Sequence, residues 1–416
     1  AVIRRILRIV IQILRSFPAL ILALTATFLF GLGTFAGTFA ITLYTFAIMT
    51  KLTYEDASAA DVKAYQALRA MGVSKYVAYI HGILPEIIPG FLTNALYLLE
   101  TNVRHSSILG YVGAGGIGLL LNEKISWLEY DKVGTILLML FLTVCVIEYF
   151  SRYLAALIRK ERTIKKEQAR LLLLFLAALF LICTFTLSLP DFSRTSPQTL
   201  RNMFAGFLQP DWSFFFSAEK DGLGYLLLET VCIAFIGTVI GAIVSAPLAF
   251  LNTKRFVPAP VSFLFNLVIM VIRSVPFLVY GLIFIRVSGP GAFTGVLTLA
   301  VCSIGLLTKR FTEALDALDL RPYHALLAMG VRPLPAICHS VLPQLKPVFT
   351  SIILYRFDVN IREASVLGLV GAGGIGAPLI FSMNQYAWEK AGAIMLGLIL
   401  LVWFIDMVSE KIGAGN

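Results

Sequence analysis

One stretch of this sequence occurs twice. Residues 102–118 read NVRHSSILGYVGAGGIG, residues 360–376 read NIREASVLGLVGAGGIG, and 12 of the 17 positions are identical. The copies are 258 residues apart (360 − 102), whereas solenoid repeats have periods of only about 20–50 residues. The chain is therefore predicted to contain two copies of one domain, at 1–160 and 161–416.

The match continues without a gap on both sides of this stretch, from Arg15 against Arg273 to Glu148 against Asp406. Residue 1 aligns with residue 259, so the first copy is shorter at its N-terminal end. We interpret this as a naturally short first half or as a truncation. Ala1 in place of Met favours a missing leading segment.

The composition predicts a membrane protein. With 58% hydrophobic and 14% charged residues and a mean hydropathy of +0.85, the chain is too apolar for a soluble domain, in which about 25% of residues are charged. Apolar runs recur along it, and we expect an all-α polytopic protein with about ten spans. These runs lie near 9–30, 34–50, 83–101, 131–151, 171–189, 223–250, 262–286, 293–308, 342–357 and 391–408.

The net charge of +10 comes from basic residues that gather between the apolar runs. The positive-inside rule assigns the intervals 51–82, 152–170 and 309–340 to the cytoplasm and leaves the loop 190–222 outside. The five cysteines are scattered, so neither a disulfide framework nor a metal site is predicted. We expect contact with membrane lipid and none with nucleic acid.

Each copy has a polar module between two apolar runs. In both, we expect a short helix, a glycine turn and a second short amphipathic helix, followed by a Leu-Pro that starts the next span. Glycine and proline are 13 residues apart in both copies (85 − 72 and 343 − 330). This spacing suits a module that docks into a groove of a partner; a purely structural loop is the alternative. The four residues are Gly72, Pro85, Gly330 and Pro343.

The module resembles the cytoplasmic loop of the permease subunits of bacterial ABC importers. That loop reads Glu-Ala-Ala, three residues, Gly, nine residues, Ile, one residue, Leu-Pro. Here Gln66 and His324 replace the leading Glu, while the following Ala67 and Ala325 agree. The resemblance implies that two copies of a separate ATPase dock on the modules. That ATPase would bind ATP and Mg²⁺, so this chain would bind no cofactor of its own and would not be an enzyme.

Charged and amide residues precede the glycine-rich turn of each copy. An arginine inside the membrane costs roughly 2.5–3.5 kcal/mol on insertion scales, so Arg104 and Arg362 require an explanation. A purely structural explanation is an ion pair with Glu100 and Asp358, four residues earlier. The other is that the two guanidinium groups contact a phosphate-like or carboxylate ligand across a central pathway. The predicted pathway residues are Glu100, Asn102, Arg104, Ser107, Asp358, Asn360, Arg362 and Ser365.

The glycines of each repeat also fit G-x-G-x-x-G, a dinucleotide-binding pattern. That pattern requires a preceding strand and a βαβ unit, but here it lies between apolar spans. We therefore interpret the glycines as a tight turn with close helix contact and a possible hinge. They are Gly113, Gly115, Gly116, Gly118, Gly371, Gly373, Gly374 and Gly376.

The whole unit, an acidic residue, one residue, Asn-Val/Ile-Arg and then VGAGGIG, resembles the signature of phosphonate-type ABC importer permeases. The resemblance implies two tandem permease repeats of parallel topology, with a type I importer or methionine-permease-like transmembrane domain. It also implies import of phosphonates, phosphite or hypophosphite into a bacterial cell across the inner membrane, by ATP-driven alternating access. A periplasmic or lipid-anchored binding protein would deliver the anion.

Two other functions are considered. An ABC permease could carry another small solute, such as methionine. A secondary transporter could use Glu100, Glu148, Asp358 and Asp406 to relay protons.

Overall fold

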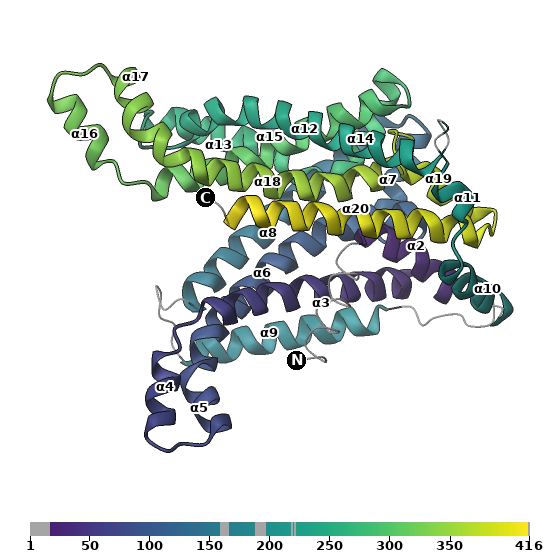
Figure 1. The fold of residues 1–416 in the computed structure, drawn as a ribbon, viewed down its shortest axis with the longest axis horizontal. Helices are drawn as coiled ribbons and strands as arrows, with labels where there is room; N and C mark the ends of the chain where they lie inside the picture. Colours follow the sequence, from purple (N-terminus) through teal and green to yellow (C-terminus); the bar gives the residue numbers. More distant parts are fainter. Residues whose placement is uncertain (1–16, 159–165, 188–196, 218, 220–221, 415–416) are drawn as a thin grey trace. The chain divides into compact units, whose positions relative to one another are not determined.

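The protein is described from a computed structural model (Figure 1). It divides into two compact units, Ala1–Leu200 and Arg201–Asn416, which we treat separately. The predicted division after residue 160 stays a prediction. The residues described are helical or irregular, with no β-strand among them, as expected of an all-α protein. They are 17–158, 166–187, 197–217, 219 and 222–414.

In the first unit, α3 packs against α2 and α6, and α6 packs against α7 and α8. The short helices α4 and α5 lie between α3 and α6 in the chain and pack on each other. The elements are α2 (Ala19–Phe30), α3 (Thr34–Ala59), α4 (Lys63–Ala70), α5 (Lys75–Gly82), α6 (Leu84–Leu109), η1 (Gly110–Val112), α7 (Ile117–Ser126), α8 (Tyr130–Ile158) and α9 (Lys166–Phe185).

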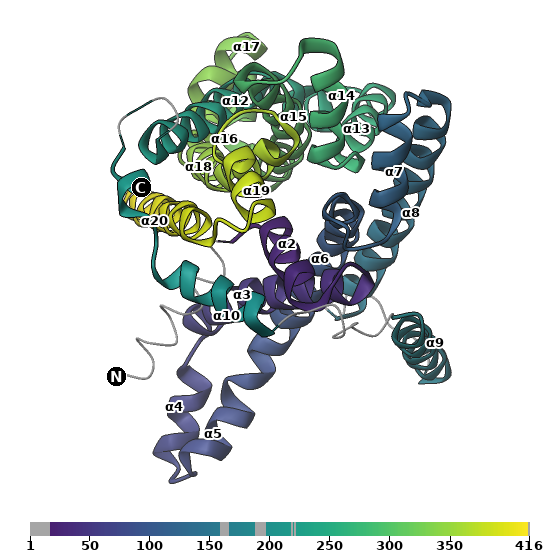
Figure 2. The same cartoon turned by 90° about the vertical axis from the view of Figure 1, so that its right-hand side faces the viewer.

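The second unit is built around α12, α15 and α18, which lie side by side and are seen end-on in Figure 2. Helix α10 (Pro197–Leu208) leads into this unit. The further elements are α11 (Trp212–Phe215), α12 (Leu223–Asn252), α13 (Ala259–Ser274), α14 (Phe277–Ser288), α15 (Ala292–Ala317), α16 (Arg321–Ala328), α17 (Pro333–Ala336), η3 (Ile337–Val341), α18 (Leu342–Leu367), η4 (Gly368–Val370), α19 (Gly376–Asn384) and α20 (Trp388–Ala414).

The predicted repeat is visible element by element. Adding the offset of 258 residues to the first residue of α2, α3, α6 and α8 gives the first residue of α14, α15, α18 and α20. No residue of the printed sequence corresponds to α12, because residue 1 aligns with residue 259.

Small residues let α12 approach α15 closely. A Cβ added to Gly241 would lie 2.4 Å from the Cβ of Ser303, and one added to Gly237 would lie 2.8 Å from the Cβ of Leu299. One turn further along, the Ser245 hydroxyl donates to the Ile304 carbonyl at 3.2 Å. Stripes of small residues of this kind are typical of helix packing in membranes.

Six helices of the described residues are long and apolar enough to cross a membrane, or eight if each of two bent helix pairs forms one span. About ten spans were expected, and the runs near 9–30 and 171–189 lie partly outside the described residues. One bent pair is α13 and α14, which meet at 85°. The break falls at Val275 and Pro276, where proline cannot continue the helix. In the first copy, Pro18 precedes α2, and Arg15 and Ser16 lie outside the described residues.

A glycine in each repeat allows a long helix to meet the glycine-rich turn. A Cβ on Gly37 would lie 2.8 Å from the Ala114 carbonyl oxygen, and one on the equivalent Gly295 would lie 2.5 Å from that of Ala372. We expect Gly295→Val to lower the free energy of unfolding of the purified protein by ~1–3 kcal/mol, and so its melting temperature, because the new side chain overpacks this contact. Gly134→Val in α8 is the control, since a Cβ there meets nothing within 4 Å. Equal melting temperatures for the two variants would contradict the prediction.

Candidate functional site

Each of the two predicted arginines pairs with the carboxylate one helical turn earlier. Arg104 Nη2 lies 2.5 Å from Glu100 Oε1 in α6, and Arg362 Nη2 lies 2.6 Å from Asp358 Oδ2 in α18. In both copies the arginine side chain is 15% exposed and the carboxylate 11%. The ion pairs expected from the four-residue spacing are therefore confirmed. Contact of the arginines with a ligand stays a prediction.

The two asparagines face the interior of their own units. Asn102 Nδ2 donates to Thr45 Oγ1 at 2.8 Å, and Asn360 Nδ2 donates to the equivalent hydroxyl of Ser303 at 2.9 Å. Asn360, which is fully buried, also donates to Thr238 Oγ1 at 2.7 Å. Both asparagines thus join their helix to its neighbours. Whether they also line a pathway stays a prediction.

The two predicted serines lie one turn before the glycine-rich turn. Ser365 is buried, and its hydroxyl donates to the Arg362 carbonyl at 2.7 Å. The backbone of Ser107 lies in α6, and its side chain is outside the described part of the chain. The Ser365 hydroxyl is thus bonded to its own helix.

The glycine-rich turn has the same backbone in both repeats. Three glycines of each copy adopt positive φ, between 78° and 84° in the first and between 76° and 90° in the second. Each turn is also bonded to the residue just before α3 or α15, by Gly33 N–H to the Gly113 carbonyl at 3.1 Å and by Gly291 N–H to the Gly371 carbonyl at 2.9 Å. The tight turn is therefore confirmed, and no strand of the described residues precedes it to support a dinucleotide site. These glycines are Gly113, Gly115, Gly116, Gly371, Gly373 and Gly374.

Close contact extends to the last glycine of the motif. A Cβ on Gly376 would lie 2.2 Å from the Ser365 carbonyl oxygen, and in the first copy Gly118 is buried at the equivalent position. The role of the turn as a hinge stays a prediction.

The polar module folds as expected in the first repeat. Helices α4 and α5 flank Gly72, which has φ 84°, and α6 begins at Leu84 with Pro85 in its first turn. In the second repeat, α16 corresponds to α4, Gly330 has φ 82°, and α18 begins at Leu342 with Pro343 in its first turn. There, however, the second short helix is α17 followed by the π-helix η3, which runs directly into α18. Pro333 and Pro335, which the first repeat lacks, lie in the first turn of α17, where proline is tolerated.

The predicted contact residues of the module are exposed in both repeats. Gln66 and Ala67 lie on α4, and His324 and Ala325 lie on α16, helices that bury none of their residues. The methionine before each glycine was not predicted. Met71 and Met329, at equivalent positions, are each 78% exposed. A methionine at the same position of a charged interval in both copies was the pattern that could have identified them.

A second feature that was missed is an aspartate before each module. Asp61 Oδ1 accepts from the Lys63 N–H at 2.9 Å, and the equivalent Asp319 accepts from the Arg321 N–H at 2.9 Å. Hydrogen bonds from the Arg321 side chain and backbone hold the pKa of Asp319 below its ordinary value. The aspartates thus fix the start of α4 and α16. The repeated Asp-x-Lys/Arg could have identified them.

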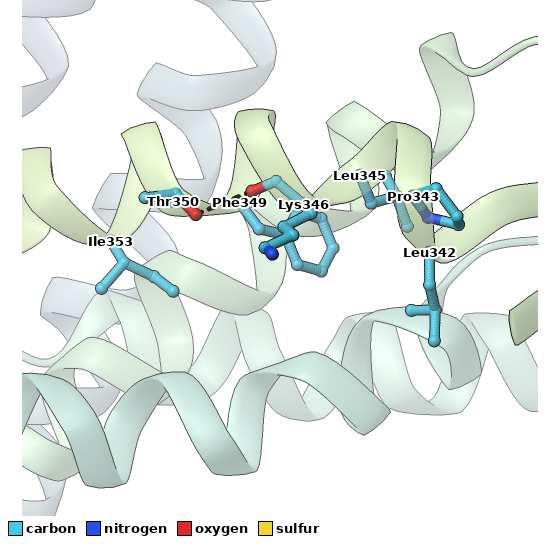
Figure 3. A pocket seen from close by; sticks show the side chains of 7 residues that line it. All are labelled: Leu342, Pro343, Leu345, Lys346, Phe349, Thr350 and Ile353. Atoms are coloured by element: carbon cyan, nitrogen blue, oxygen red, sulfur yellow. Dashed lines mark hydrogen bonds between the residues drawn. The ribbon is translucent and has the colours of Figure 1, made fainter. Parts of the chain in front are cut away.

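A hollow of about 520 Å³ lies along one face of α18, directly after the module (Figure 3). Its lining is apolar except for Lys346 and Thr350, and the Thr350 hydroxyl is bonded to the Lys346 carbonyl. Asn360 and Arg362 lie further along the same helix and do not line it. The lining residues are Leu342, Pro343, Leu345, Lys346, Phe349, Thr350 and Ile353. Among the described residues, no group of three His, Cys, Asp or Glu could hold a metal ion.

Several known proteins are similar to this chain. The Phosphate-import permease protein PhnE of Mycolicibacterium smegmatis is 27% identical over 415 residues, 98% of this chain and 77% of that protein. The Phosphite transport system permease protein PtxC of Stutzerimonas stutzeri is 36% identical over 184 residues, 44% of this chain and 67% of that protein. A chain of the MetNI methionine ABC transporter covers 46% of this chain and 96% of its own length, with 18% identity and a TM-score of 0.42.

A protein family described as "Binding-protein-dependent transport system inner membrane component" matches residues 1–164 and 237–412. The two segments take in most of both repeats, in agreement with a tandem arrangement of one membrane domain. The apolar helices are those of a multi-pass membrane protein. The chain therefore belongs to the family of inner-membrane components of binding-protein-dependent transport systems.

Proposed function

We propose that this chain is the permease of an ABC importer for phosphonates or the related oxyanions phosphite and hypophosphite. One observation carries the proposal: an arginine, held by a carboxylate, occurs at the same helix position in both repeats, just before the glycine-rich turn. A guanidinium group offers the paired donors that suit a tetrahedral oxyanion. Relatives named as phosphate and phosphite permeases support this substrate class.

The proposed partners follow from the two exposed modules. Two copies of a separate ATPase dock on 51–82 and 309–340. ATP and Mg²⁺ bind to these ATPase subunits, which hydrolyse the ATP. A binding protein delivers the anion to the opposite face of the membrane. ATP-driven movement of the docked modules then alternates access to the pathway.

A proton-coupled secondary transporter is the weaker candidate. Glu100 and Asp358 are paired with arginines, and Glu148 accepts a hydrogen bond from Arg152. An oxygen of each of these carboxylates is already engaged by a guanidinium group, which is unfavourable for a proton relay. The side chain of Asp406, the fourth carboxylate considered, lies outside the described residues.

Uptake by vesicles tests the function directly. Vesicles that contain this chain with its ATPase and binding protein should accumulate labelled methylphosphonate only when ATP is present. Phosphite should compete and methionine should not, because methionine carries a cationic amino group that the guanidinium groups would repel. Uptake that is independent of ATP and is lost when the proton gradient collapses would instead identify a secondary transporter.

Substitution of the arginines tests the pathway. We expect Arg104→Ala and Arg362→Ala each to reduce uptake by at least about tenfold, because a charge-assisted contact with the anion is lost. Binding of the ATPase should remain. Arg152→Ala is the matched control, since Arg152 also pairs with an acidic residue four positions earlier but has a side chain that is 68% exposed. Normal uptake by both pathway variants would contradict the role.

Substitution of the module glycine tests ATPase docking. A Cβ on Gly330 would meet nothing within 4 Å, so a side chain there acts through the left-handed backbone alone. That conformation costs most L-residues roughly 1–2 kcal/mol. We expect Gly330→Val to weaken ATPase binding about tenfold, and Gly330→Asn to weaken it less because asparagine tolerates positive φ. Affinity for the purified ATPase measures both, and equal, wild-type binding by the two variants would exclude the module as the docking site.

A further inference from the structure

Helix α18 and its equivalent α6 differ in a buried ion pair. In α18, Arg356 Nη2 lies 2.8 Å from Glu363 Oε2, two helical turns further along, and the Arg356 side chain is only 5% exposed. The equivalent residues of α6 are Leu98 and His105. Leu98 is buried. The His105 ring packs edge-on against the Tyr44 ring, with 5.3 Å between the ring centroids. The second repeat thus holds an ion pair at a position that the first fills with a leucine and a histidine.

The ion pair is part of a hydrogen-bonded network that joins three helices. Arg356 Nε donates to Ser303 Oγ at 3.2 Å, and Asn360 Nδ2 donates to the same oxygen at 2.9 Å. The second N–H of Asn360 is directed at Thr238 of α12 at 2.7 Å. In the first repeat, Asn102 donates to Thr45 and Asn94 donates to Asp56, both of α3. Among the described residues, the bonds of Arg356 and Asn360 thus join α18 to α15 and α12, whereas those of Asn94 and Asn102 join α6 to α3.

The network residues share one face of α18, and Arg362 projects from another. At 3.6 residues per turn, Arg356, Asn360 and Glu363 project within about 60° of one another. By the same count, Arg362 projects about 100° from Glu363, about 120° from Arg356 and about 160° from Asn360. Contacts on the network face therefore set the rotation of the helix, and with it the direction in which Arg362 points.

Fold stability does not explain why the ion pair is there. A buried ion pair often contributes no more to stability than well-packed apolar residues do, since both charges lose their hydration. The first repeat shows that the helix tolerates a leucine at the position of Arg356. Fixing one arrangement of the helices is the better-attested use of such a pair.

We propose that Arg356 and Glu363 are positioning residues, which fix the rotation of α18 and the direction of Arg362. The second repeat then presents to the anion an arginine on a helix that is held by the pair of Arg356 with Glu363, whereas the equivalent residues of the first repeat, Leu98 and His105, form no such pair. This inference rests on the proposed function. It adds that the two repeats of the permease contribute unequally to anion affinity.

The first test replaces Arg356 and Glu363 of α18 by the residues at the equivalent positions of α6. The double variant Arg356→Leu/Glu363→His is assembled with the ATPase and binding protein, and uptake of labelled methylphosphonate is measured in vesicles with ATP. We expect the KM to rise about tenfold with little change in Vmax, because Arg362 is present but no longer held in one direction. ATP hydrolysis without the anion should be unchanged. A wild-type KM in the assembled variant would overturn the proposal.

A second comparison serves if the double variant fails to assemble. Ser303→Ala removes the hydroxyl shared by Arg356 and Asn360, and Thr45→Val removes the equivalent hydroxyl of the first repeat without a change of shape. We expect Ser303→Ala to raise the KM about threefold and Thr45→Val to raise it less than about twofold. Equal effects would overturn the inequality of the repeats. If wild-type vesicles take up no methylphosphonate with ATP, the proposed function itself fails, and this inference falls with it.

Discussion

An acidic side chain four residues before an arginine allows this chain to carry guanidinium groups inside apolar helices. Glu100 with Arg104 and Asp358 with Arg362 are such pairs, and their exposures are the same in both repeats. A single arginine in a membrane helix costs roughly 2.5–3.5 kcal/mol on insertion scales. Pairing within one helix reduces this cost before any other helix is in place. The position of the arginines, and the pathway proposed around them, depends on it.

The features repeated in both copies could be predicted from the sequence. The glycine-rich turn and the module with Gly72 and Gly330 were predicted because each depends on local backbone geometry, which a short motif specifies. The four-residue ion pairs were predictable for the same reason, since both partners lie on one helix. The number of spans was less certain, because Pro276 divides one apolar run into two helices that meet at 85°.

Contacts between distant parts of the chain were not predicted. The hydrogen bond from Asn360 to Thr238 joins residues 122 positions apart, and no residue of the printed sequence aligns with Thr238 for comparison. The pair of Arg356 with Glu363 spans two helical turns rather than one, and the first repeat replaces both residues. This ion pair therefore does not appear among the features that the two copies share. The π-helix before α18 also belongs to one copy alone.

The exposed methionines have a mechanical consequence. Met71 and Met329 present the same surface on both modules, so two identical ATPase subunits docked there would deliver equal strokes. The helices that receive those strokes are attached differently, because Asn360 joins α18 to both α12 and α15, whereas Asn94 and Asn102 join α6 to α3. Two identical motors would then act on two different sets of helix contacts.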